Sequence, residues 1–154
     1  MNKIRTAYDL FCEKRFPLPT EQQVADLEKR IGVSLPPDFR QFVLEYNGGV
    51  FTEPRIVPPS EDCPLDRLTV LDGIGASHHS CELASASSLS LFDDNDPPQI
   101  VPIGYTLMGN LLYLVTHPEG FGHIGLKKAF SDDSYYLASG IDEFFGLLRV
   151  PPTE

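Results

Sequence analysis

Hydrophobic residues recur with a helical period between positions 35 and 51, and the rest of the chain is interpreted outward from this segment. Four large apolar side chains fall at positions i, i+3, i+4 and i+7 of one stretch, namely Phe39, Phe42, Val43 and Tyr46. This spacing places them on one face of a short helix, which must be buried.

The sequence also predicts where this helix begins and ends. Pro36 and Pro37 suit a first helical turn, where a missing N–H costs little and φ already has a helical value. Asn47, Gly48 and Gly49 tolerate a left-handed φ and end the helix. The segment therefore predicts a helix that turns sharply into a strand at 50–51.

Two amphipathic helices are predicted before this segment. The first covers residues 2–16, where apolar side chains recur at helical spacing. The second starts at Thr20, because Gln23 three residues later completes a capping-box pattern, and Gly32 closes it.

The second half of the chain has mostly β patterns. Strands are predicted at 55–57 and 68–71, and then as a meander at 99–104, 111–116, 122–127 and 135–137. Pro102, inside the first meander strand, indicates a sheet edge or a bulge because proline has no N–H to donate.

Two further segments have apolar patterns that are compatible with helices. Apolar residues in 77–92 permit a helix, although many serines lower its propensity. A closing helix is predicted from the apolar side formed by residues between Ile141 and Leu148, with Pro151 and Pro152 as its stop.

Helices first, then a meander, then one helix is an α+β order. We expect a single antiparallel, mostly meander sheet, packed by the N-terminal helices and one C-terminal helix. A chain of 154 residues fits one domain over residues 1–154, with 1–19 as an N-terminal helical extension and 20–150 as the core.

Cysteine usage and hydropathy bear on the cellular location. Cys12, Cys63 and Cys81 are odd in number and widely spaced, so neither a disulfide framework nor a zinc pair is indicated. The N-terminus has no apolar leader, and no run approaches the roughly 18 apolar residues of a membrane helix. We expect a cytoplasmic protein without membrane contact.

The charge is negative and unevenly distributed. The net charge is −10; residues 1–67 have nine basic and eleven acidic residues (net −2), and residues 68–154 have three and eleven (net −8). Phosphate binding requires clustered Lys and Arg, so nucleic acid is not expected as a partner, and a basic protein is more plausible. The alternative is that the acidity serves solubility alone.

No catalytic or metal-binding constellation emerges from the sequence. His78, His79 and Cys81 are metal-type residues, but no second cluster completes a tetrahedral site. The segment 73–75 lacks the third glycine of a dinucleotide loop, and no phosphate-binding GxxxxGK[ST] pattern occurs. The acidic run at 93–96 lacks the glycine and terminal glutamate of a calcium loop, and is better explained as a solvated loop or a partner surface. We predict no catalytic residue, no metal and no cofactor.

Several short motifs, taken in order, resemble a known family. They are Val24 to Glu28, Ile31-Gly32, the run at 35–39, the run from Phe42 to Gly49, 100–104, 109–113, His123-Ile124 and 137–139 leading to Phe144-Phe145. This order resembles the SUKH superfamily, which groups fungal cell-wall-assembly regulators with many bacterial immunity proteins. Its structural signature corresponds here to Leu35, Pro36, Phe39, Phe42, Tyr46, Asn47, Gly48 and Gly49. Many members have an acidic residue just before the Gly-Asn turn, where this chain has Tyr105-Thr106-Leu107-Met108, so no role of that acid transfers.

The resemblance implies an α+β fold without an active site. It also implies direct binding of a toxin, often a nuclease, in bacteria. A basic toxin domain would then meet acidic residues in the predicted loops, for which the candidates are Glu61, Asp62, Asp93, Asp94, Asp96, Asp132 and Asp133. The alternative is a regulatory scaffold that acts on proteins of its own cell, and an enzyme is a third option. The oligomeric state stays open.

Overall fold

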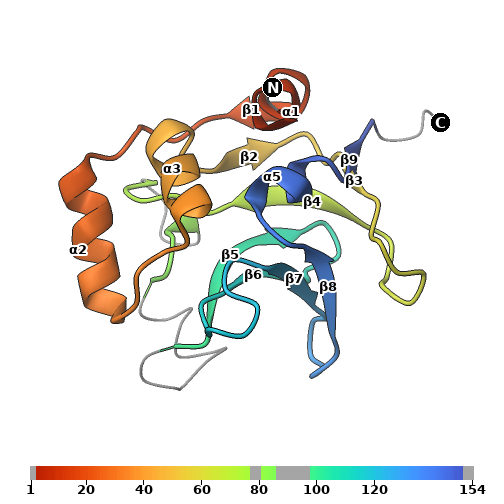
Figure 1. Cartoon of the computed structure of the whole chain (residues 1–154). Helices are drawn as coiled ribbons and strands as arrows, with labels where there is room; N and C mark the ends of the chain where they lie inside the picture. The colour runs from red at the N-terminus through yellow and green to blue at the C-terminus, as the bar shows by residue number, and fades with distance from the viewer. Residues whose placement is uncertain (1–2, 77–80, 86–97, 151–154) are drawn as a thin grey trace.

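The computed structural model describes residues 3–76, 81–85 and 98–150 and shows a curved open sheet with helices packed on it (Figure 1). The described helices are α1 (Lys3–Phe11), α2 (Glu21–Ile31), α3 (Pro37–Glu45) and α5 (Ile141–Phe145). The described strands are β1 (Cys12–Lys14), β2 (Gly49–Phe51), β3 (Arg55–Ile56), β4 (Asp66–Leu71), β5 (Ile100–Thr106), β6 (Leu111–Val115), β7 (Ile124–Lys127), β8 (Ser134–Ala138) and β9 (Leu148–Arg149).

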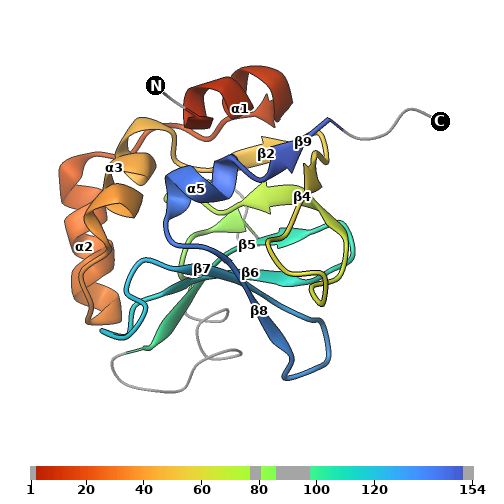
Figure 2. The ribbon, with the colours of Figure 1, turned by 45° about the vertical axis from the view of Figure 1, so that its right-hand side comes forward.

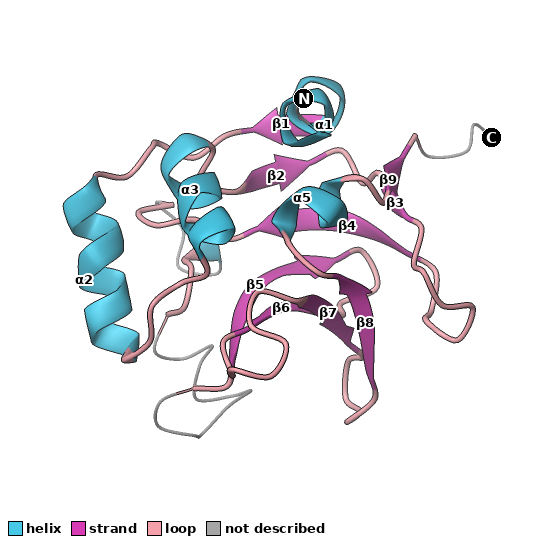
Figure 3. Cartoon of the chain, viewed as in Figure 1, coloured by secondary structure: helices cyan, strands magenta, loops and turns pink. Residues whose placement is uncertain are grey.

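The strands form a sheet in the order β1-β2-β4-β5-β6-β7-β8, and β3 joins it by pairing with both β4 and β9. Every strand pair is antiparallel, and β5 to β8 follow one another as a meander (Figure 3). The predicted α+β architecture is therefore confirmed.

The second and third helices have the boundaries that the sequence predicts. The Thr20 side chain accepts from the Gln23 N–H at 3.1 Å, and the Gln23 side chain accepts from the Thr20 N–H at 2.8 Å, which completes the capping box of α2. Gly32 closes α2 at φ 83°. The α3 helix starts at Pro37 and buries Phe39 and Phe42.

The turn after α3 brings the chain into close contact with β4. Asn47 and Gly48 have φ values of 57° and 72°. A Cβ atom on Gly48 would lie 2.4 Å from the Leu71 carbonyl oxygen, so both the backbone angle and the space require glycine. The predicted helix-to-strand corner is confirmed.

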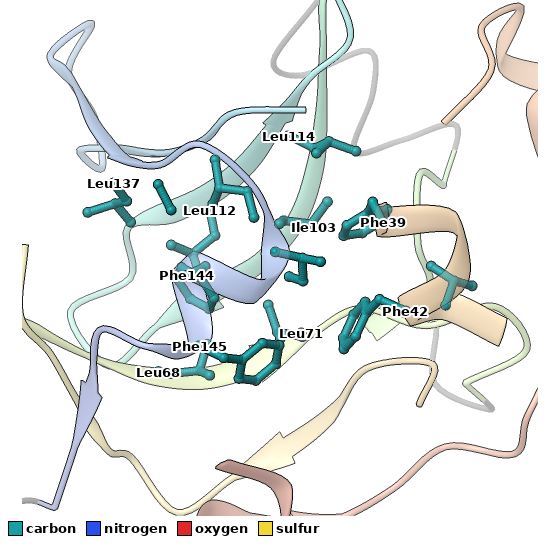
Figure 4. Packing of buried hydrophobic residues seen from close by; sticks show 14 of the residues in the cluster. Phe39, Phe42, Leu68, Leu71, Ile103, Leu112, Leu114, Leu137, Phe144 and Phe145 are labelled. Carbon is teal, nitrogen blue, oxygen red and sulfur yellow. The ribbon is translucent and has the colours of Figure 1, made fainter. Parts of the chain in front are cut away.

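The core lies between the helices and one face of the sheet. Figure 4 shows Phe39 and Phe42 of α3 and Phe144 and Phe145 of α5 packed among side chains from β4, β5, β6 and β8. Seen after a 45° turn, α1, α3 and α5 cover this face, and α2 lies at one end of it (Figure 2). A smaller cluster contains Phe16, Val70, Ala76 and Cys81.

The prediction of one helix over residues 2–16 is wrong at its C-terminal end. Helix α1 stops at Phe11, and the next three residues form β1, where Cys12 pairs with Phe51 and Lys14 with Val50. Pairing with β2, which lies about forty positions away, overrides the local helical spacing.

The prediction for the closing helix also needs correction. Helix α5 ends at Phe145, and Leu148 lies in β9, where it pairs with Ile56. Of the segment 77–92, only 81–85 is described, with a bridge between Glu82 and Gly73, and the rest of the predicted helix lies outside the described residues.

Pro102 does not lie at a sheet edge. Strand β5 pairs with β4 on one side and β6 on the other, and the register with β6 shifts between Pro102 and Gly104. Of the two predicted explanations, the bulge is confirmed and the edge is wrong.

Candidate partner-binding surface

The described residues contain no group of three or more His, Cys, Asp or Glu side chains that could hold a metal ion. Cys81 is buried in the smaller cluster, while His78 and His79 lie outside the described residues. Gly73 packs so closely on the corner that a Cβ there would lie 2.3 Å from the Asn47 carbonyl oxygen. Gly73 is thus explained by packing, whereas Gly75 has open space around it and a left-handed φ of 68°.

The candidate acidic residues lie in separate loops. Glu61 and Asp62 are exposed in the β3–β4 loop, and Asp132 and Asp133 are exposed in the β7–β8 loop. Asp93, Asp94 and Asp96 lie outside the described residues.

An exposed aromatic side chain accompanies the acids of the β7–β8 loop, which projects beyond the ends of its strands (Figure 1). Phe130 is fully exposed, and its φ is 56°. A left-handed φ costs an L-residue about 1–2 kcal/mol, and strained residues cluster at functional sites. The loop thus holds a large apolar ring in water, two residues before Asp132.

Two hydrogen bonds within this loop and one to a neighbouring turn hold its backbone in place. The Lys128 N–H donates to the Asp133 carbonyl at 2.9 Å, and the Asp133 N–H donates to the Ser131 hydroxyl at 3.0 Å. The Ala129 N–H donates to the side-chain oxygen of Asn110 at 2.8 Å. Phe130 is therefore presented by a loop with fixed geometry.

Asn110 is itself held by a buried carboxylate at the start of β4. Asp66 is 6% exposed and accepts from the Asn110 amide at 2.7 Å and from the Thr106 hydroxyl. Its other oxygen accepts from the Met108 N–H at 3.1 Å and from the Arg67 N–H at 2.8 Å. Hydrogen bonds to a buried ion are strong, so this network ties β4, the β5–β6 turn and the β7–β8 loop together.

The signature residues lie at and around the α3–β2 corner, and all of them are buried except Tyr46, which is half-buried. They are Leu35, Pro36, Phe39, Phe42, Tyr46, Asn47, Gly48 and Gly49. Tyr46 stacks on Tyr8 with 4.6 Å between ring centroids, and the Tyr8 hydroxyl donates to the Gly48 carbonyl at 2.8 Å. Buried groups cannot meet a partner, so their position suits a structural role.

A titratable carboxyl with an unusual environment follows β4. Burial, with a smaller contribution from the negative charge of Glu82, raises the pKa of Asp72 to about 8. Burial also raises the pKa of Tyr105, with smaller contributions from Cys81 and Asp72. Tyr105 packs against the smaller apolar cluster, and the described residues contain no group of metal-type side chains beside it.

A model of the SMI1 / KNR4 family (SUKH-1) matches residues 18–146. The chain belongs to that family. Domains of the SMI1 / KNR4 family are generally binding domains without catalysis, and membership is consistent with a SMI1/KNR4-like or an immunity domain. A search of curated proteins found no match. Within the described ranges, no helix has the length and apolarity needed to cross a membrane.

Sequence reasoning missed Phe130 and the buried carboxylate of Asp66. The available signal for Phe130 is a lone aromatic residue in the mostly polar run from Lys127 to Asp133, close to the candidate acids Asp132 and Asp133. Asp66 gave no such signal, because its side-chain partners Thr106 and Asn110 come from positions 40 or more residues away.

Proposed function

We propose that this SMI1 / KNR4 family domain is an immunity-type protein that neutralises a basic toxin domain, such as a nuclease, by binding it directly. The observation that carries the proposal is the braced β7–β8 loop, on which a fully exposed Phe130 stands beside Asp132 and Asp133. The exposed pair Glu61 and Asp62 adds a second acidic loop.

An exposed aromatic side chain flanked by acidic residues is suited to binding a basic partner protein. Burying an aromatic side chain in a partner pocket supplies much of the affinity of typical interfaces, where a few residues dominate. Because hydrogen bonds already fix the loop, little ordering entropy is lost on binding.

The net charge of −10 adds to the rate of encounter. A nuclease needs positive charge to hold its substrate, so complementary charge would steer the two proteins together and cover the substrate surface. We expect the association rate with a basic toxin to fall steeply as salt rises, because screening lengths shorten.

The experiment is calorimetric binding of the full chain to the toxin domain encoded beside its gene, at low and high salt. Phe130→Ala should weaken binding at least 30-fold, which corresponds to about 2 kcal/mol for an aromatic hot spot. Phe121→Ala is the matched control, because Phe121 is also exposed but lies in the β6–β7 loop, and its removal should change affinity less than threefold.

Asp132→Ser combined with Asp133→Ser should slow association mainly at low salt. Equal losses from Phe121→Ala and Phe130→Ala would reject the anchor. Absence of binding at micromolar concentrations would reject toxin neutralisation and favour the regulatory alternative, in which the partner is a protein of the same cell.

A further inference from the structure

Three arginines are aligned across neighbouring strands at the β3–β9 side of the sheet, on the opposite side of the molecule from α2 (Figure 1). Arg55 of β3 is the register partner of Arg67 in β4 and of Arg149 in β9. Directly opposed residues of antiparallel strands share one face, with Cβ atoms about 5 Å apart. The neighbouring pairs, which include Ile56 with Leu148, are buried, so the arginines occupy the outward face. We call Arg67, Arg55 and Arg149 the arginine row.

The charges of the arginine row are not neutralised within the described ranges 3–76, 81–85 and 98–150. Among the described residues, none of these three arginines forms an ion pair. Arg55 donates through Nε to the Val150 carbonyl at 3.3 Å, and Arg149 donates through Nη1 to the Gly146 carbonyl at 2.7 Å. A guanidinium has five N–H donors, so most donors of the row remain available.

Such an alignment is costly for an isolated fold. Like charges placed directly opposite on a sheet are destabilising. The chain has only 12 basic residues against 22 acidic ones, and three of the 12 stand side by side here. The arginine row therefore gathers positive charge that no described acidic side chain neutralises. Such a surface is complementary to an anionic ligand.

A mostly apolar pocket of about 410 Å³ adjoins the row. It is lined by Arg55, Ile56, Val57, Leu65, Asp66, Arg67, Leu107 and Met108. Leu65 and Met108 are 82% and 67% exposed, which is unusual for large apolar side chains. The carboxylate of Asp66 is engaged by the four hydrogen bonds described above, so its acceptor sites are occupied.

We propose that the arginine row and this pocket form a docking site for an acidic segment of a partner protein, with its carboxylates on the guanidinium groups and an apolar side chain in the pocket. Guanidinium groups bind carboxylates in a bidentate geometry, and the pocket supplies the apolar contact that charge alone lacks. A short acidic segment fits better than a nucleic acid, because a long polyanion would be repelled by the net charge of −10. The guanidinium groups of this site have no role in the proposed function, although its pocket includes Val57 and Leu65 of the β3–β4 loop, which also holds Glu61 and Asp62.

The test uses fluorescence anisotropy with the full chain and a fluorescein-labelled hexapeptide that alternates glutamate with leucine. Arg55→Glu combined with Arg67→Glu should weaken binding at least tenfold. The matched control is Lys29→Glu combined with Lys14→Glu, which makes the same change of net charge at exposed positions of α2 and β1 and should change affinity less than threefold. Met108→Ser should weaken binding at least threefold while keeping the arginines.

Several results would overturn the proposal. They are no binding of the glutamate peptide up to millimolar concentration, equal binding of the lysine counterpart of the peptide, equal losses in the control and the arginine variants, and displacement of the peptide by a tighter-binding oligothymidine. Self-association of the chain that disappears in the arginine variant would also overturn it, because the occupant would then be a second copy. Circular dichroism melting of each variant verifies that the exposed substitutions leave the fold intact.

Discussion

Replacing Asn47 by alanine should be among the most destabilising single changes at a polar position of this protein. The Asn47 side chain is fully buried and donates to the carbonyls of Pro17 at 2.7 Å and Ile74 at 2.9 Å, while its oxygen accepts from the Ile74 N–H at 2.8 Å. Each lost hydrogen bond costs about 1 kcal/mol. The φ of 57° adds about 1 kcal/mol for alanine in a left-handed conformation. We therefore expect Asn47→Ala to lower the free energy of unfolding by about 4 kcal/mol.

Urea unfolding followed by circular dichroism measures this loss, with the slope checked for two-state behaviour. Asn47→Gly separates the two contributions, because glycine removes the hydrogen bonds but tolerates the backbone angle, and it should be about 1 kcal/mol more stable than Asn47→Ala. A loss below about 1 kcal/mol for the alanine variant would refute the assignment of Asn47 as the polar link between α3, the 17–19 segment and the 72–75 turn.

Three further changes test other parts of the structure. Because the pKa of Asp72 is raised to about 8, the folded state keeps a proton that the unfolded chain loses near pH 4. The free energy of unfolding should therefore fall as the pH rises from 4 to 8, by up to about 1.4 kcal/mol per pH unit. Asp72→Asn should remove this pH dependence, which thermal melts at several pH values measure. Gly104→Ala would place a Cβ 2.2 Å from the Val70 carbonyl oxygen, and urea unfolding should show a loss of about 3 kcal/mol. Tyr8→Phe removes the buried donor to the Gly48 carbonyl and should cost about 1–2 kcal/mol in the same assay, whereas an unchanged midpoint would reject that bond.

The sequence predicts best the elements whose signals are local. The capping box of Thr20 and Gln23 and the left-handed turn at Asn47 fix their boundaries through residues only a few positions apart, and both appear in the structure. The meander strands β5 to β8 were also predictable, because short turns join neighbours that pair with each other.

The failures lie where distant pairing decides the conformation. Residues 12–14 continue a helical pattern, but they form the strand β1 because they pair with β2. The spacing of Leu148 continues the closing helix, but Leu148 lies in the strand β9 because it pairs with Ile56 of β3. In both cases tertiary hydrogen bonding overrides a local preference of a few tenths of a kcal/mol per residue.

The candidate surfaces were predictable to different degrees for the same reason. The acids of the β7–β8 loop can be recognised from loop composition, and their exposure follows from it. The arginine row cannot, because Arg55, Arg67 and Arg149 become neighbours only through the registers of two strand pairs. Its recognition required the topology as well as the residues.

Asp66 links the two candidate surfaces physically. Its carboxylate holds Asn110, which in turn holds the backbone of the loop that presents Phe130. The next residue along β4 is Arg67, whose N–H donates to the same carboxylate and whose side chain belongs to the arginine row. One buried ion thus fixes an acidic, aromatic loop on one side and a basic, apolar pocket on the other. Because the two surfaces have opposite charge, a basic toxin and an acidic segment would not compete for the same groups, and the fold can present both at once.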